Sequence, residues 1–172
     1  YSQPPGKIEL IQTHISFVFL TEKYVYKVKK AVNFGFLDFS TLEKRHVFCK
    51  KELELNRRLC PNIYLEVLPI TRLNTIKVNG AGEIVEYALK MKRLPQERLM
   101  TLLIKEDKVG KETVTGIAKI VADFHAKAQA TPEISQFGSL RIIKTNWDEN
   151  FAQTIKYINQ AITETQFQLI EE

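Results

Sequence analysis

The first third of the chain alternates apolar and polar positions in the way that β-strands do. Residues 7–13, 15–20 and 24–30 are rich in β-branched and aromatic side chains, and residues 21–23 have the composition of a tight turn. Three such runs in succession predict an antiparallel meander of three strands.

The third of these strands carries lysines on one face only. Side chains alternate between the two faces of a strand. The faces are Tyr24, Tyr26 and Val28 on one side, and Val25, Lys27, Lys29 and Ala31 on the other. The first face is typical of a core, whereas the second mixes small apolar residues with cations and therefore borders a polar group.

Residues 40–59 repeat with the period of an α-helix. Ser40 and Glu43 form a capping-box pattern at the start, and Cys60-Pro61 stops the helix. At about 100° per residue, one apolar arc is predicted. It contains Leu42, Phe48, Cys49, Leu53, Leu55 and Leu59. Arg45, Glu52 and Asn56 fall on the same arc, while Glu54 points to solvent.

Glu52 is therefore a carboxylate at a position predicted to be buried. Desolvating a carboxylate costs several kcal/mol unless a cation or several hydrogen bonds compensate. Lys27 or Lys29 on the neighbouring strand is the natural partner. A strand lysine paired with a helix glutamate is how kinases hold nucleotide phosphates, but the same residues also fit a structural ion pair beside a lysine-rich surface strand.

The remaining pattern predicts two more strands and then only helices. Residues 62–69 are extended, and residues 70–78 and 83–91 are predicted to form a hairpin across Asn79-Gly80-Ala81-Gly82. Helical stripes follow. They cover residues 94–104, residues 113–128, and a segment that a cap at residues 146–149 would begin. The predicted fold class is α+β, with a five-stranded antiparallel sheet, one long helix after the third strand, and a helical second part.

Composition and charge limit the cellular location and the kinds of ligand that we expect for this chain. The 172 residues carry a net charge of +5, which suits an anionic ligand such as a nucleotide, and no basic run is long enough to favour nucleic acid. Cys49 and Cys60 lie too far apart on one helix for a disulfide. The three histidines have no zinc spacing, and neither a signal peptide nor an apolar run of membrane-spanning length is present. We therefore expect a cytoplasmic protein that contacts no membrane.

Each of three further features can be interpreted in two ways. Thr13 and Ser16 lie at the first strand connection, where they could meet a phosphate or simply serve as turn residues. The aromatic loop of residues 33–39 either anchors itself in the core or forms a ligand platform. His125, on the border of a helical stripe, is either a packed residue or a catalytic one.

The order of elements and several runs of residues resemble a known family. The runs are residues 14–20, 25–30, 33–45 and 52–59, with G-F-L-D-F-S-T-L and L-N-R-R-L as the most specific parts. They resemble bacterial aminoglycoside-phosphotransferase-like proteins, which are protein-kinase-like. The branch concerned is an uncharacterised one that is often fused to a C-terminal P-loop ATPase domain.

The resemblance implies roles for particular residues. Lys27 would contact the phosphates of ATP, and Glu52 would orient it. Met91 would line the adenine pocket, and Lys92 and Arg93 would belong to the hinge between a small lobe, residues 1–93, and the start of a helical lobe, residues 94–172. Thr13 and Ser16 would lie near the phosphates.

The departures from the family decide what to expect of the chain alone. The H-G-D-type catalytic loop and the later magnesium-ligand aspartate do not occur in the sequence, and the family order would place them beyond Glu172. We therefore expect an excised or naturally shortened portion with no catalytic or metal-binding residue of its own. ATP would be its cofactor, and Mg²⁺ and a small-molecule hydroxyl substrate would belong to the complete parent protein. The alternative is a non-catalytic kinase-fold module that binds or regulates a partner, such as the fused ATPase domain.

Overall fold

The computed structural model describes residue 6 and residues 8–171. It is a mixed α+β structure that divides into two compact units, Tyr1–Val114 and Thr115–Glu172. The first unit contains the sheet and the long helix, and the second is helical. Each is described by itself below.

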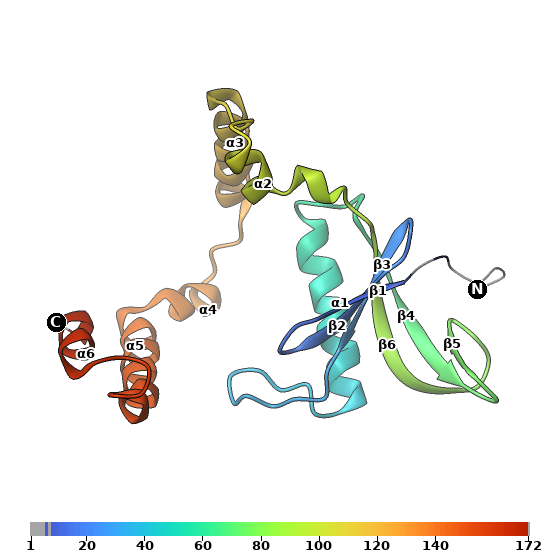
Figure 1. Ribbon diagram of the computed structural model, residues 1–172, viewed down its shortest axis with the longest axis horizontal. Helices are drawn as coiled ribbons and strands as arrows, with labels where there is room; N and C mark the ends of the chain where they lie inside the picture. The colour runs from blue at the N-terminus through green and yellow to red at the C-terminus, as the bar shows by residue number, and fades with distance from the viewer. Residues whose placement is uncertain (1–5, 7, 172) are drawn as a thin grey trace. The chain divides into compact units, whose positions relative to one another are not determined.

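The first unit is built on one antiparallel sheet of six strands in the order β1-β2-β3-β6-β4-β5 (Figure 1). The strands are β1 (Glu9–Gln12), β2 (Ser16–Leu20), β3 (Tyr24–Lys29), β4 (Tyr64–Arg72), β5 (Ile76–Val78) and β6 (Glu83–Lys92). The predicted three-strand meander is confirmed as β1, β2 and β3, although Lys7 of the first predicted strand lies outside the described residues. β6 pairs with β3 and so joins the meander to the rest of the sheet.

The prediction of five strands was wrong, because residues 70–78 do not form one strand. They contain the end of β4, a bend, and the short β5, which turns back and pairs with β4 from Ile70 opposite Val78. The predicted hairpin across residues 79–82 is also wrong, since β5 and β6 both pair with β4 rather than with each other. Because both are antiparallel to β4, β5 and β6 run in the same direction, which a hairpin across residues 79–82 would not allow. Strand pairing is a long-range property that a turn signal does not fix.

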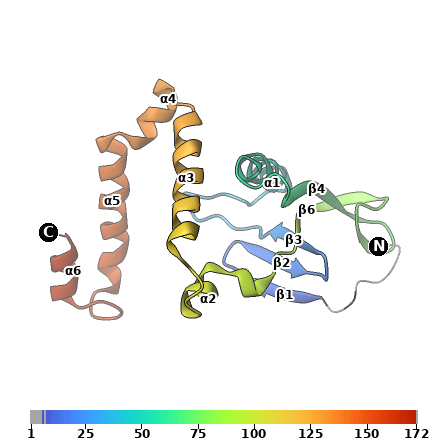
Figure 2. The same cartoon turned by 90° about the horizontal axis from the view of Figure 1, so that it is seen from above.

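Helix α1 (Leu42–Arg57) lies across one face of the sheet and packs against β4 and β6 (Figure 2). Its N-cap is Thr41 rather than Ser40, because the Thr41 hydroxyl accepts a hydrogen bond from the backbone N–H of Lys44 at 3.3 Å. The buried residues of the helix are Arg45 and Cys49, so its apolar arc is narrower than predicted. Leu55 and Leu59 are half exposed.

The opposite face of the sheet encloses an apolar hollow of about 280 Å³. Its core consists of Tyr26, Val28 and Ala88. Ile8, next to one edge strand, and Ile76 on the other edge strand both line the hollow, so the sheet curls around it. The predicted alternation of β3 is confirmed, because Tyr26 and Val28 face this hollow and Lys27 and Lys29 face α1.

The first unit continues beyond the sheet with two short helices, η1 (Gln96–Arg98) and α2 (Met100–Lys105). The next helix, α3 (Lys111–Lys127), begins in the first unit and ends in the second. The second unit then contains α4 (Pro132–Ser135), η2 (Gln136–Gly138), α5 (Leu140–Thr154), η3 (Ile155–Tyr157) and α6 (Glu164–Glu171). α5 begins six residues before the predicted cap at Asn146, because the Ser139 hydroxyl caps it by accepting from the Ile142 N–H.

α5 and α6 meet through aromatic side chains. Phe167 is the buried apolar residue of this pair of helices, and its ring lies edge-on to that of Phe151 with centroids 5.4 Å apart. Trp147 extends the cluster by a contact of 5.1 Å to Phe151. The second unit therefore has a small aromatic core of its own.

Candidate functional site

Three charged side chains meet between β3 and α1. The Lys27 Nζ lies 2.8 Å from Oε1 of Glu52, and the Lys29 Nζ lies 2.6 Å from Oε2 of the same carboxylate. Each lysine thus binds a different oxygen. The predicted pairing of Glu52 with the strand lysines is confirmed, and both candidate partners are used. We call these three residues the lysine–glutamate triad.

The triad is shielded from solvent to different degrees. The side chain of Lys29 is 5% exposed, that of Glu52 18%, and that of Lys27 27%. Lys29 therefore lies at the inner end of the cluster, and Lys27 is the cation that a molecule outside the protein can reach.

The two lysines keep Glu52 ionised. Burial raises the pKa of the Glu52 carboxyl, but the hydrogen bonds and the charges of Lys27 and Lys29 lower it, and the result is a pKa below its usual range. Cys49, one helical turn earlier, stays neutral because burial raises its pKa to about 11. Two ammonium groups and one carboxylate leave the triad with one positive charge in excess.

Neighbouring groups hold Glu52 in place on the helix. The side-chain amide of Asn56 donates a 2.8 Å hydrogen bond to the backbone carbonyl of Glu52. This bond explains why a polar residue such as Asn56 can lie on the buried arc. Arg45, the third polar residue there, is buried and pairs with Glu86 of β6 through its Nε at 2.7 Å. All three polar residues on the buried arc of α1 are therefore satisfied, as the cost of burying polar groups requires.

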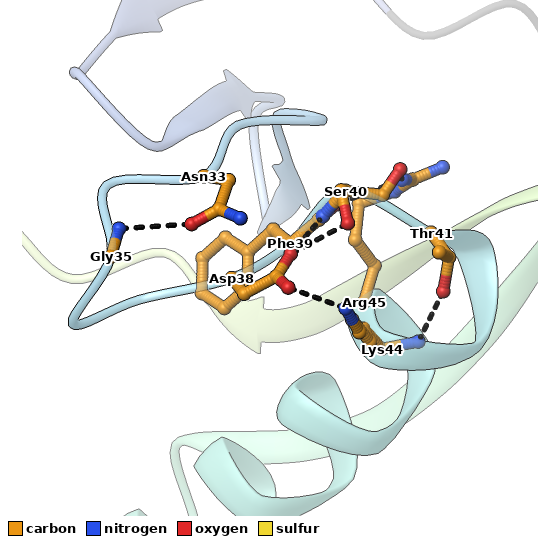
Figure 3. Close-up of polar contacts among 8 residues, drawn as sticks. All are labelled: Asn33, Gly35, Asp38, Phe39, Ser40, Thr41, Lys44 and Arg45. Carbon is orange, nitrogen blue, oxygen red and sulfur yellow. Dashed lines mark hydrogen bonds and ion pairs between the residues drawn. The ribbon is translucent and has the colours of Figure 1, made fainter.

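The loop that joins β3 to α1 is fixed at its base. Asp38 pairs with Lys44 and accepts hydrogen bonds from the hydroxyl and the backbone N–H of Ser40, and these contacts lower its pKa to about 2 (Figure 3). Gly35, at φ +82°, donates its N–H to the Asn33 side chain at 2.9 Å. The loop is thus a closed structure rather than a loose connection.

The aromatic residues of this loop divide into two groups. Phe39 is 2% exposed and packs edge-on against Phe48 of α1, with ring centroids 5.0 Å apart. Phe34 is half exposed and Phe36 is 90% exposed, with their rings stacked at 6.3 Å. The interpretation that the loop anchors itself in the core holds for Phe39 and is wrong for Phe34 and Phe36.

Met91, predicted for the adenine pocket, and Lys92, predicted for the hinge, are the last two residues of β6, and Arg93 follows the strand. Met91 lies opposite Val25 in the sheet register. Val25 is two residues before Lys27 on β3 and points to the same face, so Met91 and Lys27 share one face of the sheet. The backbone N–H of Lys92 donates to Ile63 and that of Arg93 to Lys23. The Arg93 guanidinium binds the Thr21 carbonyl and pairs with Glu9. Both N–H groups are therefore engaged within the protein.

Thr13 and Ser16 bind each other. The Thr13 hydroxyl accepts from the Ser16 N–H at 2.9 Å and donates to the Ser16 carbonyl at 3.3 Å, which closes the turn between β1 and β2. Ser16 lies opposite Lys29 in the register and is fully buried. Its hydroxyl has no hydrogen-bond partner among the described residues. These contacts match the interpretation of the two residues as turn residues, and burial keeps the Ser16 hydroxyl away from a ligand in this conformation.

The donor groups of the triad fit an anion better than they fit a metal ion. The excess positive charge of the lysine–glutamate triad suits an anion, with Lys27 as the accessible donor. Within residues 6 and 8–171, no group of three or more His, Cys, Asp or Glu side chains could hold a metal. Cys49 and Cys60 are both free thiols, as expected from their separation. The same residues include no helix long and apolar enough to cross a membrane.

Comparisons with known proteins give relatives without an assigned activity. An uncharacterised protein of Mycobacterium bovis and its counterparts in two strains of Mycobacterium tuberculosis are each 26% identical over 156 residues. The match covers 91% of this chain but 30% of each relative, so the chain spans less than a third of their length. No protein-family model matches the chain, and no solved structure matches it.

Two parts of this site were harder to find from the sequence. The sequence offered Lys27 or Lys29 as the partner of Glu52, because both lysines share a strand face. It did not predict that both bind the carboxylate. Glu86 was missed as the partner of Arg45. The signal for it was the unexplained arginine on the apolar arc of the helix, which required a carboxylate somewhere in the sheet.

Proposed function

We propose that the first unit is the ATP-binding portion of a kinase-like phosphotransferase, similar to aminoglycoside phosphotransferases and acting on a hydroxyl of a small molecule. The observation that carries the proposal is the contact of Lys27 on the third strand with Glu52 on the helix that follows it. In protein kinases, a strand lysine held by a helix glutamate binds the nucleotide phosphates.

Two further features support this proposal. The triad has an excess positive charge at its accessible end, where an anion would be attracted. Val25 and Met91 pair across neighbouring strands and share the face of Lys27, where a base could lie beside the phosphate site. Adenine would have to use backbone groups other than the N–H of Lys92 and of Arg93, since both are engaged.

Phosphoryl transfer itself needs groups that these 172 residues do not contain. The sequence has no H-G-D-type loop, and the described residues have no magnesium-binding cluster. When bound, Mg²⁺ would neutralise phosphate charge, and the part of the chain that the structure describes supplies no cluster to hold it. We therefore assign ATP binding to this chain, and catalysis, the hydroxyl substrate and a fused P-loop ATPase domain to a longer parent protein.

Titration calorimetry with ATP tests this assignment. We expect Lys27→Met to weaken ATP binding about tenfold, the equivalent of about 1.4 kcal/mol, because the accessible phosphate donor is lost. Lys50→Met, on the exposed side of α1, is the matched control and should bind as the wild type does. Equal affinities in all three proteins would contradict the role of Lys27.

The second candidate is a non-catalytic kinase-fold module. The engaged N–H groups of Lys92 and Arg93 favour it, because they reduce the backbone donors available to a base. It predicts that the wild type does not bind ATP and that Lys27→Ala leaves binding to the partner intact. The calorimetric experiment therefore separates the two candidates.

A further inference from the structure

We infer that Lys29 is the positioning residue of the site: together with Phe39 it holds Glu52 from the buried side, so that the charge of Lys27, although Lys27 also contacts Glu52, remains available to a phosphate. This inference rests on the proposed function and concerns how the same site is supported. It assigns different roles to two lysines that are two positions apart on one strand and bind one carboxylate.

Burial separates the roles of the two lysines. The Lys29 side chain is 5% exposed and that of Lys27 is 27% exposed. A ligand that approaches the triad from solvent can therefore touch Lys27 but not Lys29. The Lys29 contact with Oε2 of Glu52, at 2.6 Å, is also the shorter of the two. Lys29 thus acts on a ligand only through Glu52 and Lys27.

The aromatic ring of Phe39 supports Lys29 in turn. The Lys29 Nζ lies 4.7 Å from the centre of this ring, which places a cation against an aromatic face away from water. Phe39 itself is fixed, because Arg45 donates to its carbonyl at 3.0 Å and its ring packs on Phe48. The chain of contacts runs from the fixed base of the loop through Phe39 and Lys29 to Glu52 (Figure 3 shows its loop end).

The charge of Lys29 decides whether Lys27 is available. With both lysines present, the buried ammonium of Lys29 compensates the Glu52 carboxylate, and the charge of Lys27 remains for an anion. Without Lys29, Lys27 and Glu52 would form a neutral pair. A phosphate would then have to compete with Glu52 for Lys27, so anion binding should weaken although no ligand contact is lost.

A double-mutant cycle tests this dependence in the full 172-residue chain. Binding of inorganic tripolyphosphate is measured by calorimetry for the wild type, Lys27→Met, Lys29→Met and the double variant. We expect Lys29→Met to weaken binding about tenfold in the wild type and less than about twofold in the Lys27→Met background, because residues that act as one unit are non-additive. Lys30→Met is the matched control, since Lys30 contacts Phe17 and Gln12 rather than Glu52.

The same variants give a readout that needs no ligand. Carbon-13 NMR follows the titration of the Glu52 carboxyl, whose signal is assigned by its loss in Glu52→Gln. We expect its pKa to rise in Lys29→Met and, by a smaller amount, in Phe39→Leu, while Lys30→Met leaves it unchanged. Phe39→Leu keeps the test available if Lys29→Met does not fold.

The outcomes separate this inference from the proposed function. If the wild type binds neither ATP nor tripolyphosphate, the proposed function fails, while the Glu52 titration still decides whether Lys29 and Phe39 hold the carboxylate. Equal effects of Lys29→Met in the two backgrounds would show that Lys29 does not act through Lys27 and would overturn the inference. An unchanged Glu52 pKa in Lys29→Met and Phe39→Leu would also overturn it.

Discussion

The two faces of the six-stranded sheet are buried by different means. Charged residues lie between α1 and the sheet, of which Lys29 of β3 and Arg45 of α1 are buried, and each is paired with a carboxylate. The opposite face is apolar, and the sheet curls on itself to shield Tyr26, Val28 and Ala88. A charged group below a helix requires a specific partner, whereas an apolar group requires only exclusion of water. The α1 face therefore depends on specific ion pairs, and it is the face on which the proposed function rests.

The largest expected effect comes from removing the shared carboxylate. Glu52→Ala leaves the buried Lys29 without its ion-pair partner, and we expect a loss of about 3 kcal/mol in the free energy of unfolding. Urea denaturation followed by circular dichroism measures it. Glu54→Ala is the control, because Glu54 is exposed on the same helix. A similar stability for both variants would show that the triad contributes little to folding.

A smaller effect is expected on the apolar face. Val28→Ala removes two buried methyl groups at the edge of the hollow, which should cost about 2 kcal/mol at about 0.8 kcal/mol per group plus a cavity contribution. The substitution should leave ATP binding unchanged, because Val28 points away from α1. Urea denaturation and calorimetry on one preparation check both statements, and reduced ATP affinity would show that the two faces are coupled.

The smallest expected effect is a difference in pH dependence between the two faces. The folded-state pKa of Glu52 lies below its ordinary value of 4.5, so the ion pairs contribute stability above pH 4.5. That contribution is lost as the pH falls through the folded-state pKa. The stability difference between the wild type and Glu52→Gln should therefore shrink below pH 4.5.

Val28→Ala provides the comparison for this measurement. Its stability difference from the wild type should stay constant with pH, since no titrating group is changed. Asp38, whose pKa is lowered to about 2, is present in all three proteins, so its acid titration cancels in the differences. Urea denaturation at pH 3 to 7 provides the data, and parallel curves for the two variants would contradict a role for ionised Glu52.

The site was more predictable than the sheet that carries it. The alternation along β3 and the helical period of α1 placed Lys27, Lys29 and Glu52 on facing surfaces, because both periods are properties of the local backbone. The pairing of β4 with both β5 and β6 was not predictable in this way. It joins segments through contacts that compete with a plausible local hairpin.

Local sequence patterns also failed to predict the first residues of two helices. The N-cap of α1 is Thr41 and not the predicted Ser40, because the Ser40 hydroxyl already binds Asp38. α5 begins at Leu140 because Ser139 caps it, although Asn146 has an equally suitable side chain. Capping residues compete, and the packing of the segment decides which of them is used.

The sequence by itself determined which side chains could meet. It placed lysines on one face of β3 and a carboxylate on the buried arc of α1, and a buried carboxylate requires a cation. Only the tertiary structure decided that both lysines bind Glu52, one on each oxygen, and that Lys29 is the buried one. The physical reason is that burial and ion-pair geometry depend on how α1 lies across the sheet and on where Phe39 packs, and these are long-range contacts that no local pattern encodes.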